Sequence, residues 1–280
     1  TSDTATYGTE LFGLGHDYQG ILHVVGPEFG ITQPGLVIAG ADSHTSTHGA
    51  LGAYAFGIGS SEVAHVLATQ TLWRSKPKTL RVTISGKRQA GVSSKDLILV
   101  LIKTIGSGGA VGYAIEYYGD TINELSVEAR MTVCNMTIEA GARAGLIAPD
   151  EKTFDYLKGK TMSPKGENWA KAIEYWKTLY SDKDCKFDKE INIDGKNIEE
   201  NSILKLGVGL ILGTVQNAQN AKMRGILNFE VWRRDVTRHD GRWPYPDPVP
   251  DRTVGESIVP RAAYYPYMVA IGRGRRVRRP

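Results

Sequence analysis

Cysteine is scarce in this chain of 280 residues, which contains only Cys134 and Cys185. Two cysteines exclude a disulfide framework, and we therefore expect a protein of the reducing cytoplasm. Long apolar runs are also missing, because none approaches the ~20 residues that span a bilayer. The first residues carry neither the basic nor the apolar segment of a secretory signal, so we expect no membrane association and no secretion.

The remaining composition is ordinary for a soluble globular protein, with 41% hydrophobic and 23% charged residues. The net charge of +4 is unevenly distributed, because the chain becomes strongly basic and proline-rich from about Lys222 onward. We predict a first α/β segment over residues 1–77 and a second α/β domain over 78–200. Residues 201–280 should form a divergent, poorly ordered Pro/Arg-rich tail.

Short apolar runs and helix-start signals alternate along the chain and predict an α/β fold with a mainly parallel sheet. The strand-like runs are Ile21 to Val25, Leu36 to Ala39, Thr79 to Ile84 and Tyr113 to Tyr118. One helix should begin near Ser60. Capping boxes, in which Ser or Thr is followed three residues later by an acid, predict two more, at Ser93 with Asp96 and at Thr121 with Glu124.

Asp42, Ser43 and His44 follow the Leu36–Ala39 run directly, at the carboxyl end of a predicted buried strand, where open α/β sheets bind their ligands. Neighbouring residues on an extended backbone point to alternate faces, so these three cannot form a nucleophile–base–orienter triad. Asp42 and His44 can share one side, where the carboxylate would raise the imidazole pKa and favour proton donation. Alternatively, Asp42 and Ser43 only cap a turn.

Two further residues are candidates for the same site. His23 lies in the strand-like Ile21–Val25 run, where a histidine is ordinarily part of the core. Glu116 is the one acid in the apolar stretch AIEYYG, and a buried carboxylate is costly unless it is paired or bound to a ligand.

Four stretches of the chain resemble the aconitase superfamily, and within it the large subunits of isopropylmalate dehydratases. They are GILHVVGPEFG, GADSHTSTHGALGAYAFGIGSSEVAHVLATQTL, AIEYYGD and EARMTVCNMTIEAGARAGLIAPDEKTFDYLKGK. The similarity covers about Leu11 to Asn192. It implies aconitase-like α/β/α units, and a hydro-lyase that isomerises 2- and 3-isopropylmalate by dehydration and rehydration in leucine biosynthesis.

The resemblance also implies roles for the candidate residues. Enzymes of this family hold a [4Fe–4S] cluster on three cysteines, two typically in C-x-x-C spacing, and its open iron binds a hydroxy-dicarboxylate or tricarboxylate-like substrate. His44, oriented by Asp42, would protonate the leaving hydroxyl, and Ser43 would bond within the substrate shell. Glu116 would face the iron-bound oxygen, and His23 would join the hydrogen-bond network. The base belongs to a swivelling small subunit or domain.

This chain departs from that pattern in its cysteines. It has two in total and no C-x-x-C, and Cys134 matches a family cysteine that is not a cluster ligand. Beyond about Glu200 the resemblance ends, so the domain that carries the cluster is missing. We therefore expect a truncated form that is inactive by itself, and we assign no residue to a metal or cofactor.

Two other functions remain open. The first is homoaconitase or another aconitase-like hydro-lyase, because much of the substrate contact in this family lies outside the similar region. The second is a nucleic-acid-binding or scaffold protein that uses the basic tail, whose aromatic residues could stack on bases. The basic residues of the tail show no groove-like periodicity, which disfavours this second function.

Overall fold

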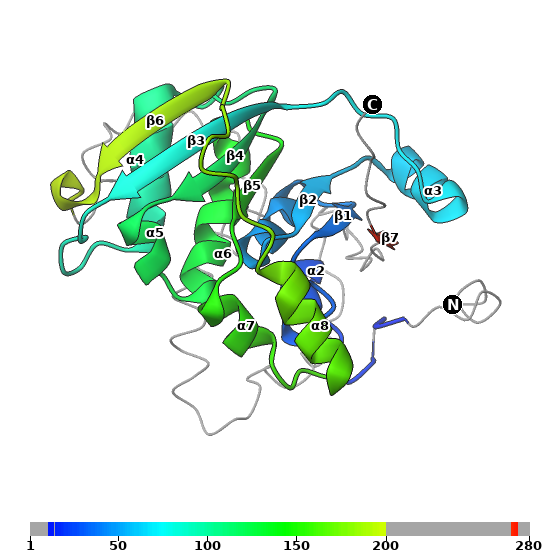
Figure 1. The fold of residues 1–280 in the computed structure, drawn as a ribbon. Coiled ribbons are helices and arrows are strands. Elements are labelled where there is room, and N and C mark those ends of the chain that lie inside the picture. Colours follow the sequence, from blue (N-terminus) through cyan, green and yellow to red (C-terminus); the bar gives the residue numbers. More distant parts are fainter. Residues whose placement is uncertain (1–10, 14, 200–269, 274–280) are drawn as a thin grey trace, which may run out of the picture. The chain divides into compact units, whose positions relative to one another are not determined.

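The computed structural model describes residues 11–13 and 15–199, together with the backbone of residues 270–273 (Figure 1). By its contacts the chain divides into one unit formed by Thr1–Ile211 with Pro266–Pro280 and another formed by Leu212–Tyr265. The second unit and nearly all of the predicted tail lie outside the described residues. The domain boundaries and the nucleic-acid hypothesis therefore stay predictions.

A four-stranded sheet forms the larger part of the described fold, with its strands side by side in the order β5-β4-β3-β6 (Figure 1). The strands are β3 (Lys78–Ser85), β4 (Tyr113–Tyr118), β5 (Ala144–Ile147) and β6 (Lys189–Asp194). All three pairings are parallel, as the alternating pattern of strands and helices predicts. The inner strands bury Leu80, Val82 and Ile115 completely, which anchors the sheet in the core.

A smaller sheet has the order β2-β1-β7. Its strands β1 (Leu36–Gly40) and β2 (Tyr54–Gly57) are parallel, and β7 (Ala270–Arg273) pairs with β1 in the antiparallel direction. The prediction of strand β1 is confirmed. The sequence does not predict strand β2, because its four residues lie in a stretch rich in Gly, Ser and Thr that is typical of a loop.

The predicted strand at Ile21–Val25 is wrong, because these residues begin the helix α2 (Leu22–Glu28). The two valines favour a strand locally, but the Ile21 carbonyl accepts hydrogen bonds from the amides of both Val24 and Val25. Packing against the neighbouring segment outweighs local propensity here. A Cβ at Gly26 would lie 2.8 Å from both the His48 ring and the Thr32 hydroxyl, so only glycine allows this close approach.

Of the two predicted capping boxes, the first is confirmed. Helix α4 (Ser94–Ile105) is capped by Ser93, with the Asp96 carboxylate accepting from the Ser93 amide. The second is wrong, because the Thr121 hydroxyl instead donates to the Gly86 carbonyl, and Ser126 caps the following helix.

The remaining helices are α3 (Ser60–Thr69), α5 (Asp120–Glu124), α6 (Val127–Asn135), α7 (Glu151–Leu157) and α8 (Glu167–Trp176), with short 3₁₀ helices η2 (Met136–Ala140) and η3 (Gly195–Asn197). Helix α3 begins where the sequence predicts. Helices α7 and α8 pack through the stacked rings of Phe154 and Trp176. Within the described ranges no helix combines the length and the apolar character needed to cross a bilayer.

The 3₁₀ helix η1 (Ser43–Leu51) joins the two sheets and fixes the position of the candidate residues. Most of it is buried, and the Ser46 hydroxyl donates to the Cys134 carbonyl of α6 while accepting from the Gly145 amide of β5. A Cβ at Gly49 would lie 1.7 Å from the Gly145 carbonyl oxygen. Glycine therefore lets η1 lie directly on β5, and the exposed first residue of η1, Ser43, is held near the end of β1.

Candidate functional site

Asp42 connects strand β1 to helix η1, and it plays both of the roles that the sequence left open. As the N-cap of η1, its carboxylate accepts a hydrogen bond of 2.8 Å from the His44 amide. The same oxygen, Oδ1, lies 3.1 Å from His23 Nε2 and 3.5 Å from His44 Nδ1. A turn-capping carboxylate is thus also the centre of a charged cluster.

His44 is held between two carboxylates. Its Nε2 lies 3.2 Å from Oε1 of Glu139, which belongs to η2, and its Nδ1 faces Asp42 and the Ser43 hydroxyl, the latter at 3.2 Å. Only 13% of the His44 side chain is exposed. Glu139 was not identified from the sequence, although it lies in the family-like stretch NMTIEAG, because nothing local links two residues that are 95 positions apart.

The charge state of His44 follows from these neighbours. Burial by itself lowers the imidazole pKa, but the hydrogen bonds to Asp42 and Glu139 outweigh it and raise the His44 pKa to about 9. Hydrogen bonds from the His23 and His44 side chains hold the pKa of Asp42 far below its ordinary value. At neutral pH the site therefore presents an imidazolium that has a proton to donate.

His23 and a second histidine, His48, lie behind Asp42. The two rings meet edge to face, with their centroids 5.8 Å apart. His48 Nδ1 lies 2.6 Å from the Thr32 hydroxyl, and complete burial lowers the His48 pKa to about 3, so that ring stays neutral. The structure thus brings the predicted His23 into contact with Asp42, and it adds His48, which the sequence did not identify as part of the site.

The structure does not bring Glu116 to this cluster, contrary to the sequence-based expectation. Alternation along β4 points Glu116 away from the face on which the Tyr117 hydroxyl bonds the Thr137 hydroxyl of η2. Glu116 instead pairs with Arg81 of β3 at 3.3 Å and accepts from Ser181. Its cost of burial is met by that ion pair, and the carboxylate that reaches His44 is Glu139.

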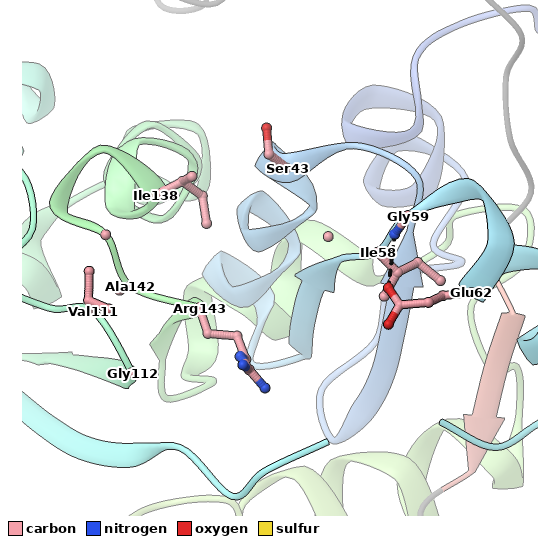
Figure 2. A pocket seen from close by; sticks show the side chains of 11 residues that line it. Ser43, Ile58, Gly59, Glu62, Val111, Gly112, Ile138, Ala142 and Arg143 are labelled. Atoms are coloured by element: carbon pink, nitrogen blue, oxygen red, sulfur yellow. Dashed lines mark hydrogen bonds between the residues drawn. The ribbon is translucent and has the colours of Figure 1, made fainter. Parts of the chain in front are cut away.

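An open cleft of about 480 Å³ adjoins the cluster (Figure 2). Ser43 lies on its rim, and the other lining residues come from the end of β2, from α3, from η2 and from the segments just before β4 and β5. They are Gly57, Ile58, Gly59, Glu62, Val111, Gly112, Ile138, Gly141, Ala142 and Arg143. Among the predicted site residues, Ser43 alone lines this cleft.

The thiols of this chain do not fit a [4Fe–4S] cluster, which needs three thiolates. Cys134 is buried within α6, and burial raises the pKa of its thiol strongly, which opposes thiolate formation. Cys185 lies 3.7 Å from an Arg81 nitrogen, in the network of Glu116 rather than of His44. No three His, Cys, Asp or Glu side chains of the described residues are arranged to hold a metal ion. We therefore derive no step through a cluster.

Comparison with known proteins gives two findings. The sequence profile of the aconitase family (aconitate hydratase) matches residues 1–205. A 3-isopropylmalate dehydratase large subunit from Cytophaga hutchinsonii is 56% identical over 198 residues, which make up 71% of this chain and 42% of that protein. The chain thus spans less than half the length of this relative, and the His44 cluster lies within the residues that the family profile matches.

Proposed function

The chain belongs to the aconitase family, and we propose that it supplies the proton-donating side of a hydro-lyase site that interconverts 2- and 3-isopropylmalate. The observation that carries this proposal is the position of His44, which lies between Asp42 and Glu139 and next to Ser43 on the rim of an open cleft. The identity of 56% to a 3-isopropylmalate dehydratase large subunit supports this substrate over citrate or homocitrate.

The chemistry of dehydration explains why such a group is needed. Hydroxide is a poor leaving group, and protonation by His44 as the C–O bond breaks lets the oxygen depart as water. A base removes the proton from the neighbouring carbon, and the C–H electron pair becomes the new C=C bond. Asp42 and Glu139 then orient the neutral His44 ring, which takes a proton from water as the hydroxide adds to the other carbon, while the base returns its proton to the carbon that lost the hydroxyl.

We propose that the base comes from a partner, because the one acid of the described residues that lines the cleft, Glu62, is already held by the Gly59 amide and Arg74. The name of the Cytophaga hutchinsonii relative, a large subunit, supports a small subunit as that partner. Two free cysteines support a cytoplasmic location. In this proposal the chain by itself does not turn over 2-isopropylmalate.

A chimera tests this function. Residues 1–205 of this chain would replace the matching segment of the Cytophaga hutchinsonii protein, which contributes the rest of the sequence, and the small subunit would be added. We expect dehydration of 2-isopropylmalate to the conjugated unsaturated diacid, and the ultraviolet absorbance of this product measures the rate. Citrate and homocitrate should be poor substrates. A preference for citrate or homocitrate would favour the alternative aconitase-like activity.

The matched variants are His44→Gln and Glu116→Gln in the chimera. His44→Gln removes the proton donor, so we expect kcat to fall by about 10²–10⁴-fold, the usual range for general acid catalysis. Glu116→Gln changes a carboxylate of the separate Arg81 network, and we expect kcat to stay within about twofold. A chimera that is folded but inactive, or one that keeps its rate without His44, would refute the proposed function.

A further inference from the structure

We propose that Arg143 and the cleft beside Ser43 form the subsite for the second carboxylate of the substrate, the one on the carbon arm away from the departing hydroxyl. This inference rests on the proposed function, which it deepens by assigning the recognition of a branched dicarboxylate to particular residues. Three observations carry it: the position of the cleft, its charged residues and its apolar lining.

The position of the cleft links it to the acid. Ser43 lies on its rim, and the Ser43 hydroxyl is 3.2 Å from Nδ1 of His44. Figure 2 shows the Arg143 side chain extending from beside Ala142 toward the side of the cleft that carries Gly59 and Glu62. Arg143 and Ser43 thus line the same cleft, and the Ser43 hydroxyl connects that cleft to His44.

Among the described residues, Arg143 and Glu62 are the two charged ones that line the cleft, and their formal charges balance. Arg143 forms no ion pair within 4.0 Å with any carboxylate of the described residues, and its hydrogen bond to the Ser75 carbonyl is long, at 3.4 Å. The acid in the cleft, Glu62, already accepts from the Gly59 amide and from Arg74, the latter at 2.7 Å. A guanidinium without a carboxylate partner is suited to bind one in bidentate fashion.

Part of the remaining lining is apolar. Ile58, Val111 and Ile138 line the cleft, and 67% of Val111 is exposed even though it is a hydrophobic residue. An arginine beside branched hydrocarbon side chains matches a dicarboxylate with an isopropyl substituent. A third carboxylate, as in citrate, would be desolvated against this surface without a partner, which is unfavourable.

The test measures binding to the intact 280-residue chain by calorimetry at pH 7.5. The probes are 2-isopropylmalate and the analogue in which its CH₂COO⁻ arm is replaced by a methyl group. We expect Arg143→Gln to weaken 2-isopropylmalate binding by about 10- to 100-fold, as expected for a lost charge-assisted bond. Binding of the monocarboxylate analogue should change by less than about twofold, because it has no second carboxylate to lose.

Two control variants separate recognition from general charge effects. Glu62→Gln keeps an acceptor for the Gly59 amide but removes a negative charge from the cleft, so it should tighten 2-isopropylmalate binding. Arg88→Gln removes the same charge as Arg143→Gln at a residue that bonds the Val92 carbonyl and does not line the cleft. It should leave both affinities unchanged. Unchanged circular dichroism would show that each variant is folded.

The subsite is overturned if the wild-type chain does not bind 2-isopropylmalate, or if Arg143→Gln weakens both probes equally. Failure of the subsite can be distinguished from failure of the proposed function. An active chimera whose KM is insensitive to Arg143→Gln would refute the subsite alone. An inactive chimera, together with Arg143-dependent binding of the dicarboxylate by this chain, would refute the isomerase function and leave the carboxylate subsite standing.

Discussion

Replacement of Glu139 by glutamine tests how the charge of His44 is maintained. Glutamine has nearly the same shape and keeps an acceptor for His44 Nε2, but it removes the negative charge that lies 3.2 Å from the ring. Because burial alone lowers the imidazole pKa, His44 depends on its two carboxylates to stay protonated. We expect the His44 pKa to fall in the Glu139→Gln variant.

The size of the effect follows from the contacts. Raising the His44 pKa from 6.5 to about 9 corresponds to about 3 kcal/mol of preference for the charged ring. Asp42 and Glu139 share this effect, and the loss of one close opposite charge typically moves a pKa by about 1–2 pH units. In Glu139→Gln the His44 pKa should therefore lie between about 7 and 8, so that much of the ring is neutral at pH 7.5.

The assay is a pH titration of the intact chain by NMR with labelled histidine, and the His44 signal is assigned by its loss in His44→Gln. The control is Glu116→Gln, which neutralises a carboxylate that is paired with Arg81 rather than with His44. It should leave the His44 titration in place. An unchanged His44 pKa in Glu139→Gln would show that this contact does not set the charge.

Three further predictions concern stability. Because the His44 pKa is raised on folding, the charged ring stabilises the folded chain fully below about pH 6.5, and this stabilisation is lost as the pH rises through about 9. Urea unfolding of the wild-type chain, compared with His44→Gln, should therefore show a loss of up to about 3 kcal/mol in the free energy of unfolding between these two pH values. Arg130→Met removes the fully buried guanidinium that pairs with Asp150 and should lower the free energy of unfolding by about 3 kcal/mol. The lower end of the usual range is expected because water can reach Asp150, whose side chain is 29% exposed, and a loss under 1 kcal/mol would contradict the assignment. Gly49→Ala places a Cβ 1.7 Å from a carbonyl oxygen of β5 and should lower the free energy of unfolding by at least about 2–3 kcal/mol. The control Gly108→Ala, whose Cβ would have its nearest contact 3.9 Å away, should lower it by under about 1 kcal/mol. Equal effects of the two substitutions would contradict the close packing of η1 on β5.

The elements that the sequence predicts correctly are those whose signals are local. The capping box at Ser93 and the apolar run at Leu36 each depend on residues a few positions apart, and both lie where expected. The run at Ile21 begins a helix instead, and the close approach of that helix to His48 at Gly26 is a tertiary contact that no local pattern records. Strand β6 was missed since it is an edge strand with mostly exposed, polar residues.

The candidate site shows the same division. Asp42, Ser43 and His44 could be found because they are consecutive and follow a buried strand. Glu139 could not, because its role depends on η1 and η2 meeting across the two sheets. Glu116 was chosen because an acid in an apolar strand signals function or pairing, and the structure shows pairing, with Arg81. Which of the two acids reaches His44 depends on the face to which each points, and that is a tertiary property.

The protonation state of His44 at pH 7.5 is the quantity on which the proposed chemistry depends. A ¹⁵N NMR spectrum of the histidine-labelled chain shows it directly, since a protonated ring carries hydrogen on both nitrogens. We predict that both His44 nitrogens are protonated, while His48, whose pKa burial lowers to about 3, shows a neutral ring. A His44 ring with one bare nitrogen at this pH would contradict the assignment of His44 as the proton donor.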